Sequence, residues 1–411
     1  MNPPTCRHCG APLTRTFVDL GLSPLANNYV RPEHGDARDA KYPLHARVCE
    51  KCFLVQVDDA VPASEIFSED YAYFSSFSES WLKHAERYCE SITARLGLGP
   101  QSLVVEIASN DGYLLQYFKA KGIQVLGVEP SGSVAAEAER KGIPTRVEFF
   151  GKALATTLRA EGVAPNLVCA ANVLAHVPDI NDFVDGVSTM LSGDAVFTVE
   201  FPHILNLIED VQFDTIYHEH YTYLSLLTVE RIFASYGLRV FDVEAVPTHG
   251  GSLRVYACRV DASHAAGPGV EAMRALERKA DLDKLAGYEG FQPRVEALRA
   301  GLLEFLETER AAGRRVAGYG AAAKGNTLLN YCGIGPDLVA YVVDRNPSKQ
   351  GTLLPGSRIP VLPVEALQET PPDDVLILPW NLREEIIHQL SFLGERGVRF
   401  VTAVPAVEIS G

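Results

Sequence analysis

Six side chains that can donate, accept or transfer a proton lie together in the sequence YHEHYTYLS, residues 217–225. Removing a proton from a carbon beside a carbonyl group requires a base with a near-neutral pKa and hydrogen-bond donors for the enolate oxygen. Histidine and tyrosine suit these two tasks, so the segment is a candidate acid–base centre. Its proton-active residues are Tyr217, His218, Glu219, His220, Tyr221 and Tyr223.

Two other interpretations of the HEH triplet stay open. It could bind a metal ion, although adjacent residues on a strand or helix point in different directions and seldom share one ion. It could also be a polar surface loop. A second aromatic segment, DYAYFSSFSESW, carries Tyr71 and Tyr73 at alternating positions, and taken alone it suggests packing rather than chemistry.

Two CxxC pairs near the N-terminus point to a metal. Each pair presents two thiolates to one ion, and two pairs complete a closed tetrahedral zinc shell with no open position for water, so we expect a structural site. A redox dithiol or two unrelated pairs are the alternatives, and His8 or His45 could replace one ligand. The predicted ligands are Cys6, Cys9, Cys49 and Cys52.

The segment EIASNDGYLL follows a buried strand and opens a helix, which places a tight turn at the strand's carboxyl end. Gly112 would let the backbone approach a ligand. Glu129 ends the next strand, where an acid can accept hydrogen bonds from ribose hydroxyls. His176, after a third strand, extends the same crevice. The predicted nucleotide-binding residues are Glu106, Ser109, Asn110, Gly112, Glu129 and Asn172.

A second glycine-rich turn, GYGAAAKG, follows a strand near the C-terminus. It satisfies a relaxed dinucleotide fingerprint, with an acid at the end of the next strand, so NAD is one interpretation. A lysine where the helix opens equally suits the phosphates of a nucleotide-linked sugar. The pattern alone leaves both open. The candidate residues are Gly318, Gly320, Lys324, Asn326 and Asp344.

The elements that must position these residues fall into three regions. We expect a small domain over 1–65, a βα-alternating domain over 66–255 and a second βα domain over 256–411, because two separate runs of βα units imply two doubly wound sheets. Buried parallel strands are predicted at 103–108, 125–130, 167–173, 195–202, 314–320, 338–344 and 374–380. A long helical pattern is predicted over 269–312.

Composition limits the functional classes. The 411 residues carry a formal charge of −15, with 47% hydrophobic and 22% charged residues. The negative charge argues against nucleic acid or anionic membranes as partners, and no apolar run is long enough to span a membrane. The N-terminus lacks the pattern of a signal peptide, so we expect a cytoplasmic monomer or small homo-oligomer.

Taken together, these segments resemble the dTDP-sugar C-methyltransferases, which make branched deoxysugars such as those on antibiotics. The resemblance extends from Cys6 to about Pro379. It is carried by CRHC…CEKC, DLGLSPLANNY, EIASNDGYLL, NVLAHVPD, FDTIYHEHYTYLS, HGGSLRVY and GYGAAAKGNTLLNY, in that order.

The resemblance implies a zinc-binding N-terminal domain, a class I methyltransferase domain for S-adenosylmethionine and a Rossmann-like C-terminal domain for the nucleotide sugar. It favours the sugar nucleotide over NAD. It also implies that His220 is the base, with Tyr217, Glu219 and His176 in the site and a tyrosine, Tyr71 or Tyr73, beside them.

The implied reaction is methylation at C-3′ of a dTDP-linked 4-keto-deoxysugar. His220 would remove the proton made acidic by the keto group, and tyrosine and histidine donors would stabilise the enolate. Methylation at C-5′, which also adjoins the keto carbon, is an alternative. An NAD-dependent oxidoreductase and a non-catalytic nucleotide-sugar-binding protein are alternatives from other classes.

Overall fold

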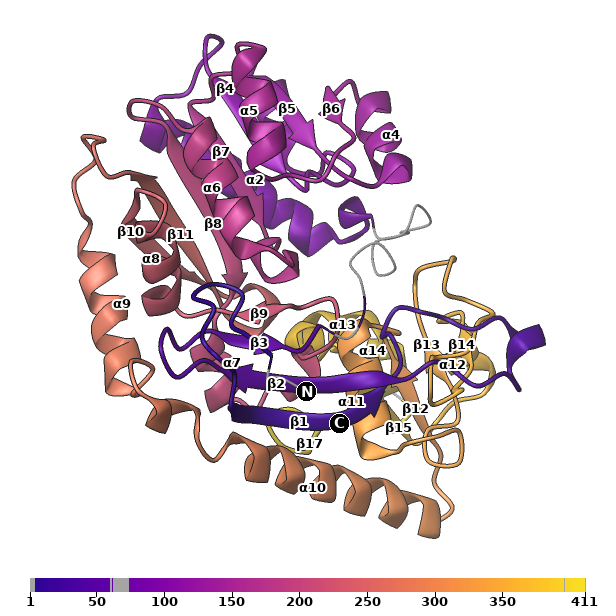
Figure 1. The fold of residues 1–411 in the computed structure, drawn as a ribbon. Helices are drawn as coiled ribbons and strands as arrows, with labels where there is room; N and C mark the ends of the chain where they lie inside the picture. Colours follow the sequence, from indigo (N-terminus) through magenta and orange to yellow (C-terminus); the bar gives the residue numbers. More distant parts are fainter. Residues whose placement is uncertain (1–3, 60, 62–73, 395, 411) are drawn as a thin grey trace.

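The computed structural model describes residues 4–59, 61, 74–394 and 396–410. Three sheets organise the chain (Figure 1): one of four strands, one of seven and one of six. The two larger sheets confirm the prediction of two doubly wound domains. Within the described residues, no helix combines the length and apolar character needed to cross a bilayer.

The four-stranded sheet contains a strand from far along the chain. Its first three strands, β1 (Arg15–Ser23), β2 (Tyr42–Val48) and β3 (Val55–Val57), are antiparallel neighbours. The fourth is β9 (Thr222–Tyr223), which pairs with β3. The segment YHEHYTYLS therefore enters the sheet of the N-terminal domain.

The seven-stranded sheet has the order β10-β11-β8-β7-β4-β5-β6. Strands β4 to β8 are parallel, whereas β10 and β11 are antiparallel. The predicted strands agree with β4 (Leu103–Ile107), β5 (Gln124–Val128), β7 (Leu167–Ala171) and β8 (Val196–Pro202). The remaining strands are β6 (Thr145–Arg146), β10 (Leu238–Val246) and β11 (Ser252–Arg259), so the sheet continues past residue 255.

Helices cover both faces of this sheet because its strands are apolar on both sides. Val104 belongs to a core with residues of α2 (Glu79–Leu96) and α3 (Leu115–Ala120). Its neighbour Val105 belongs to the opposite core, with α5 (Lys152–Ala160), α6 (Ile180–Met190) and α8 (Leu226–Ala234). Helices α4 (Gly132–Arg140) and α7 (Ile204–Glu209) complete the domain.

The single helix expected over 269–312 is interrupted. It consists of α9 (Pro268–Lys279), a 3₁₀ turn (Leu285–Tyr288) and α10 (Phe291–Ala311). Gly290, with φ of +77°, redirects the chain so that Tyr288 and Phe291 enter the core against the N-terminal sheet. Phe291 stacks there on Phe17 with ring centroids 4.5 Å apart. Tertiary packing therefore overrides the helical periodicity.

The C-terminal sheet has the order β14-β13-β12-β15-β16-β17. Its strands are parallel except the last. They are β12 (Val316–Tyr319), β13 (Val342–Val343), β14 (Val361–Leu362), β15 (Asp374–Ile377), β16 (Arg399–Thr402) and β17 (Glu408–Ser410). The helices are α11 (Ala323–Cys332), α12 (Ala366–Glu369), α13 (Arg383–Gln389) and α14 (Ser391–Gly394).

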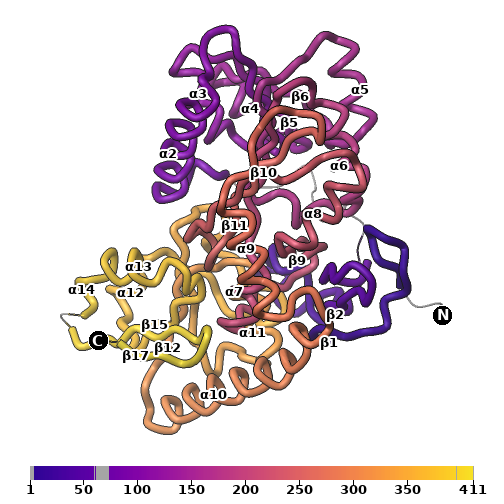
Figure 2. The backbone as a smooth tube through the Cα atoms, turned by 90° about the vertical axis from the view of Figure 1, so that its left-hand side faces the viewer, coloured from indigo at the N-terminus to yellow at the C-terminus, as the bar shows by residue number. Residues whose placement is uncertain are grey.

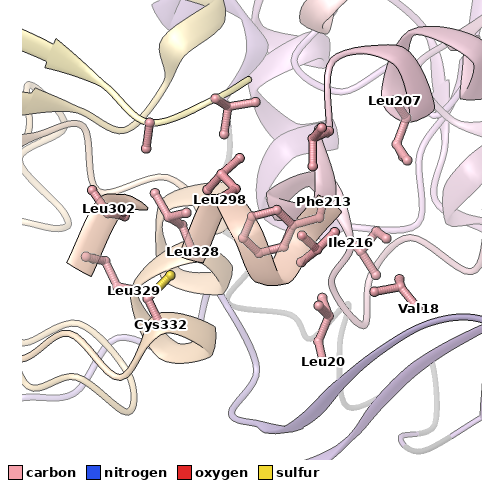
Figure 3. Close-up of a cluster of buried hydrophobic side chains, with 14 of the residues drawn as sticks. Val18, Leu20, Leu207, Phe213, Ile216, Leu298, Leu302, Leu328, Leu329 and Cys332 are labelled. Carbon is pink, nitrogen blue, oxygen red and sulfur yellow. The ribbon is translucent and has the colours of Figure 1, made fainter. Parts of the chain in front are cut away.

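One hydrophobic core joins all three parts of the chain. Figure 3 shows Val18 and Leu20 of β1, Phe213 and Ile216 before the YHEHY segment, and Leu328 of α11 around one apolar centre. Figure 2 shows the N-terminal and C-terminal segments below the seven-stranded sheet, with α10 along the lower edge. Because burial of such side chains supplies most of a fold's stability, the three parts stabilise one another.

Candidate active site

The four cysteines of the two CxxC pairs converge on one point. Their sulfur atoms all lie within 4.8 Å of one another. The Cys6–Cys52 and Cys9–Cys49 sulfurs are each 3.5 Å apart. Zinc–sulfur bonds of about 2.3 Å in a tetrahedron place sulfur atoms about 3.8 Å apart, so the cluster fits one zinc ion.

The surroundings of this cluster favour a structural role. Gln56 Nε2 donates a hydrogen bond to Cys6 Sγ, and the Lys51 amide donates to Cys49 Sγ. His8 bonds Asn181 and His45 bonds Thr16, so neither histidine substitutes for a cysteine. The cysteines supply four ligands, which closes the shell to a reacting water.

A cavity of about 430 Å³ opens at the carboxyl ends of β4, β5 and β7, where doubly wound sheets bind nucleotides. All three strand ends contribute to its walls: Ile107 ends β4, Val128 ends β5 and Asn172 follows β7. Aromatic rings line the rest. They are Trp81, Tyr113, Phe149, Phe150 and Phe183.

Glu129 is held as an acceptor in this cavity. Its two carboxylate oxygens accept backbone N–H bonds from Ser131 and Asn110, at 2.9 and 3.0 Å. Each oxygen keeps further lone pairs for a ligand. Burial raises the pKa of Glu129, while the two backbone N–H bonds oppose that rise.

Two asparagines reach the cavity from strained backbone. Asn110 and Asn172 have φ of +50° and +57°, the left-handed region that asparagine tolerates better than most residues. Asn110 Oδ1 accepts a hydrogen bond from the Ser75 amide. Asn172 Oδ1 is buried and has no partner within the described residues, so it can accept from a bound ligand.

Three predicted nucleotide-binding residues lie behind the cavity wall. Glu106 is fully buried, and desolvation raises its pKa well above the usual value. Ser109 Oγ lies against Gly127, where an added Cβ would be only 2.4 Å away. Gly112 faces Ile143, whose Cδ1 would be 2.3 Å from an added Cβ. Packing and its φ of +76° both require a glycine at this position.

His220 is fixed in one tautomer. Its Nδ1 lies 2.8 Å from the Thr215 carbonyl oxygen, which can only accept, so Nδ1 carries the proton. Nε2 then accepts from the Tyr217 hydroxyl at 2.9 Å. Burial, followed by the nearby His176, lowers the pKa of His220 well below its usual value. The imidazole is therefore neutral at pH 7, with its basic lone pair on Nε2.

His176 forms the link between His220 and the cavity. It lines the cavity, and its ring packs edge-on against His220 with centroids 4.6 Å apart. Its Nδ1 donates to the Glu219 carbonyl at 2.9 Å. Burial lowers the pKa of His176 to about 4. By contrast, His218 turns towards β2, where its Nε2 donates to the Pro43 carbonyl at 3.2 Å.

The Glu219 side chain is bound by the N-terminal segment. Asn27 Nδ2 donates to its Oε1 at 2.7 Å. Burial raises the pKa of Glu219 to about 7, while Asn27 and the charge of Lys349 oppose that rise. Sequence analysis missed Asn27 and Lys349, although Asn27 lies in the motif DLGLSPLANNY.

Among the predicted residues of the C-terminal domain, the glycines allow close packing and the polar side chains form hydrogen bonds. A Cβ added at Gly318 would lie 2.7 Å from Val342, and one added at Gly320 would lie 2.6 Å from Pro379. The Asp344 carboxylate accepts hydrogen bonds from the backbone N–H groups of Ala321 and Asn346. It therefore ties together the loops that follow β12 and β13. Asn326 Nδ2 donates to the Ala26 carbonyl at 2.6 Å, while its buried Oδ1 has no partner among the described residues.

Lys324 contacts two residues that were not predicted from the sequence to belong to a site. Its ammonium donates to Asn381 Oδ1 at 2.7 Å and lies 4.5 Å from the centre of the Trp380 ring. Trp380 Nε1 donates to the buried Asp214 at 2.7 Å. Burial lowers the pKa of Lys324, and it raises that of Asp214 to about 6. The predicted Tyr71 and Tyr73 lie outside the described residues.

Family models match three consecutive parts of the chain. Residues 6–67 match a zinc binding domain, residues 81–243 a methyltransferase domain and residues 247–405 a C-methyltransferase C-terminal domain. The C-methyltransferase NovU of Streptomyces niveus is 36% identical over 400 residues, covering 97% of this chain and 95% of that protein.

Solved structures similar to part of the chain include the magnesium protoporphyrin IX methyltransferase of Synechocystis with bound S-adenosylmethionine. It is 15% identical, has a TM-score of 0.36, and the match covers 49% of this chain and all of that one. A Haloferax volcanii complex of a methyltransferase with its Trm112 activator contains a chain of 14% identity and TM-score 0.35, matched over 44% of this chain and 94% of that one.

The fold and the matched domains define a class I methyltransferase that uses S-adenosylmethionine and carries a zinc-binding domain. The chain belongs to the C-methyltransferase family that includes NovU, and it is an S-adenosylmethionine-dependent C-methyltransferase. The resemblance noted in the sequence is thereby confirmed at the level of family and reaction class.

The cysteine cluster predicts one structural zinc ion per chain. Cys6→Ser combined with Cys52→Ser should lower the zinc content well below one and reduce thermal stability, because a structural zinc contributes folding free energy directly. Elemental analysis of the purified chain checks this. Cys89→Ala, which removes a buried thiol outside the cluster, is the control and should keep its zinc. Full zinc content in the double variant would contradict the assignment.

The raised pKa of Glu219 predicts a pH-dependent stability effect. The folded pKa of about 7 exceeds the ordinary 4.5. Stability is therefore lost as pH rises between these values, by about 3 kcal/mol in full. Glu219→Gln removes that penalty, so its unfolding free energy relative to wild type should increase from pH 5 to pH 8.

Urea unfolding at the two pH values measures this difference. Glu289→Gln, at an exposed carboxylate, is the matched control and should show no such change. A stability difference for Glu219→Gln that stays constant or reverses with pH would contradict the explanation by burial.

Proposed function

We propose that this methyltransferase acts on C-3′ of a dTDP-linked 4-keto-deoxysugar through an enolate formed by His220. The observation that carries the proposal is the state of this histidine. It is neutral, its N–H is committed to the Thr215 carbonyl, and its Nε2 lone pair lies beside a phenol and next to a cavity-lining histidine. That arrangement suits a general base.

The 430 Å³ cavity is the proposed site for S-adenosylmethionine. Glu129 would accept hydrogen bonds from the ribose hydroxyls, and the unpartnered Asn172 Oδ1 would accept another from the donor. When bound, the donor supplies an electrophilic methyl group on a sulfonium. We place that methyl group at the end of the cavity formed by His176, since this end adjoins His220.

The proposed reaction begins when the Tyr217 hydroxyl leaves His220 Nε2 and the sugar C-3′ proton is transferred to that nitrogen. The electron pair of that C–H bond forms the enolate, and the Thr215 carbonyl supports the imidazolium through Nδ1–H. The nucleophilic carbon then forms a bond to the methyl group as the methyl–sulfur bond breaks. S-adenosylhomocysteine leaves with the bonding electrons, and the proton on His220 Nε2 then passes to water.

The C-terminal domain would hold the nucleotide. Lys324 is the proposed diphosphate ligand, because its ammonium lies over the Trp380 ring in a buried position where a charged partner is strongly favoured. Asn326, two residues further along α11, has a buried Oδ1 with no partner in the described residues and is a second candidate acceptor for the substrate. In this arrangement the sugar extends from the C-terminal domain towards His220.

Glu129 provides a test of the donor site. Glu129→Ala should weaken S-adenosylmethionine binding by roughly 1–3 kcal/mol, the usual cost of losing a hydrogen bond to a charged group. Titration calorimetry measures this affinity, and Glu129→Gln, which keeps an acceptor, should lose less. Unchanged affinity in a folded Glu129→Ala variant would remove Glu129 from the donor site.

His220 provides the test of the reaction. Wild-type chain incubated with S-adenosylmethionine and a panel of nucleotide-linked keto-deoxysugars should add one methyl group to the dTDP-linked 4-keto sugar, as measured by mass. His220→Ala should lower turnover by roughly two orders of magnitude or more, the scale of general-base loss. Donor affinity should change little.

His218→Gln is the matched control, because His218 lies in the same segment but turns towards Pro43. It should keep turnover within about tenfold of wild type. Near-normal turnover in His220→Ala would exclude it as the base, and methylation of none of the sugars would overturn the substrate assignment.

A further inference from the structure

The turn that begins the motif HGGSLRVY joins the donor cavity to the C-terminal domain. It connects β10 to β11, and His249 at its start lines the cavity. The His249 ring packs edge-on against Trp81 with centroids 5.1 Å apart. On the other side, Gly250 lies so close to Trp380 that an added Cβ would be 2.4 Å from the indole. The turn is therefore enclosed by the walls of both proposed binding sites.

The backbone of this turn is strained and firmly held. His249 has φ of +57°, a conformation that a non-glycine residue adopts at an energetic cost. Gln212 Nε2 donates to the Gly250 carbonyl at 2.8 Å, and Ser252 Oγ donates to the Thr248 carbonyl at 2.9 Å. These bonds fix the conformation that directs the His249 side chain. Such strain is found where side-chain placement matters for function.

The other two histidines of the site cannot stabilise an enolate oxygen while they are neutral. The single N–H of His220 is bonded to the Thr215 carbonyl, and that of His176 to the Glu219 carbonyl. Each neutral ring therefore presents Nε2 as an acceptor. An enolate oxygen needs donors, so a donor must come from elsewhere in the site.

His249 has such a donor available. Neither of its ring nitrogens has a hydrogen-bond partner in the described part of the chain. Burial and the charge of Lys324 lower the pKa of His249 to about 4, so the ring is neutral at pH 7 and carries one N–H. A neutral imidazole can polarise a carbonyl group without giving up its proton.

His249 shares the donor cavity with His176, whose ring packs against His220. His249 contributes to the lowered pKa of His220, and Lys324 and His176 act on both rings. His176 and His249 both line the donor cavity, so a methyl group delivered from it meets these two residues on its way to the carbon beside His220. The carbonyl carbon of the substrate adjoins that carbon.

We propose that His249 is a catalytic residue that donates a hydrogen bond from its neutral ring to the keto oxygen of the substrate, and that this bond strengthens as the enolate forms. The inference rests on the proposed function. His249 keeps its proton throughout, while His220 accepts the proton removed from carbon. The two histidines thereby take separate roles, acceptor and donor, that their tautomers and surroundings impose.

The test compares two substitutions at this position. His249→Gly removes the side chain but suits the positive φ, so any loss arises from the missing ring rather than from the backbone. His249→Gln keeps an N–H donor at a similar reach. With the dTDP-linked 4-keto sugar, His249→Gly should lower kcat by roughly 100-fold or more, the scale for loss of one enolate-stabilising donor. His249→Gln should recover at least part of that loss.

A second readout isolates enolate formation. In deuterium oxide with S-adenosylhomocysteine bound, the wild type should exchange the sugar C-3′ hydrogen, and His249→Gly should exchange it more slowly by a similar factor. Affinity for S-adenosylmethionine, measured by calorimetry, should stay within about threefold of wild type, well under 1 kcal/mol.

The outcomes separate this inference from the proposed function. Wild-type exchange that His249→Gly retains at full rate overturns the role of His249 alone. A fall in donor affinity as large as the fall in kcat also overturns it, because His249 would then serve donor binding. A wild type that neither methylates nor exchanges any keto-sugar nucleotide overturns the proposed function and this inference together.

Discussion

The pairing of β9 with β3 is the constraint on which the rest of the candidate active site depends. Through it, the segment that carries the acid–base residues becomes a strand of the zinc-binding domain, with Tyr223 opposite Val55 and Thr222 opposite Gln56. A strand in a sheet has few conformational choices, because each residue is tied by backbone hydrogen bonds and by the alternation of its side chains. The residues just before β9, which include His220, are therefore held in place as well.

Each part of the chain then fixes another side of the same segment. The N-terminal loop reaches Glu219 through Asn27, and the methyltransferase domain reaches Tyr221 through the Ala175 carbonyl. From the C-terminal domain, Thr327 donates to the Ile216 carbonyl and Trp380 to Asp214. The cysteine cluster adjoins the same sheet, because Gln56, which lies opposite Thr222, donates a hydrogen bond to Cys6 Sγ.

Desolvation determines the chemistry once the segment is in place. Burial lowers the pKa of His176, His220 and His249, and it raises that of Glu219. The three imidazole rings are thus uncharged at pH 7. Backbone carbonyls accept the N–H groups of His176 and His220, so the other ring nitrogen of each histidine is an acceptor. The residue types in the sequence do not reveal this assignment. Such shifted groups cluster at functional sites because water has been excluded there.

The sequence predicts local features better than contacts between distant segments. Strand ends such as Glu129 and the four cysteines could be placed from periodicity and spacing, because these depend on near neighbours. The break at Gly290 could not, since it serves contacts with Phe17 that are made only in the folded chain. Nor could Asn27, Trp380 or the tautomer of His220, each of which depends on residues distant in sequence. Nor does the sequence show that Gly112, Gly318 and Gly320 are tightly packed, because a glycine required by packing has the same sequence signature as one required by a ligand.

The interleaving of distant segments also sets an order for protein synthesis. The cavity is lined by residues 75–249, so its described walls are synthesised before the C-terminal sheet. The surroundings of Asp214 wait for Trp380, and those of Ile216 for Thr327. A nascent chain therefore contains every described wall of the cavity before it contains the residues that enclose Asp214 and Ile216. The environment of the YHEHY segment is complete only after residue 380 has been added.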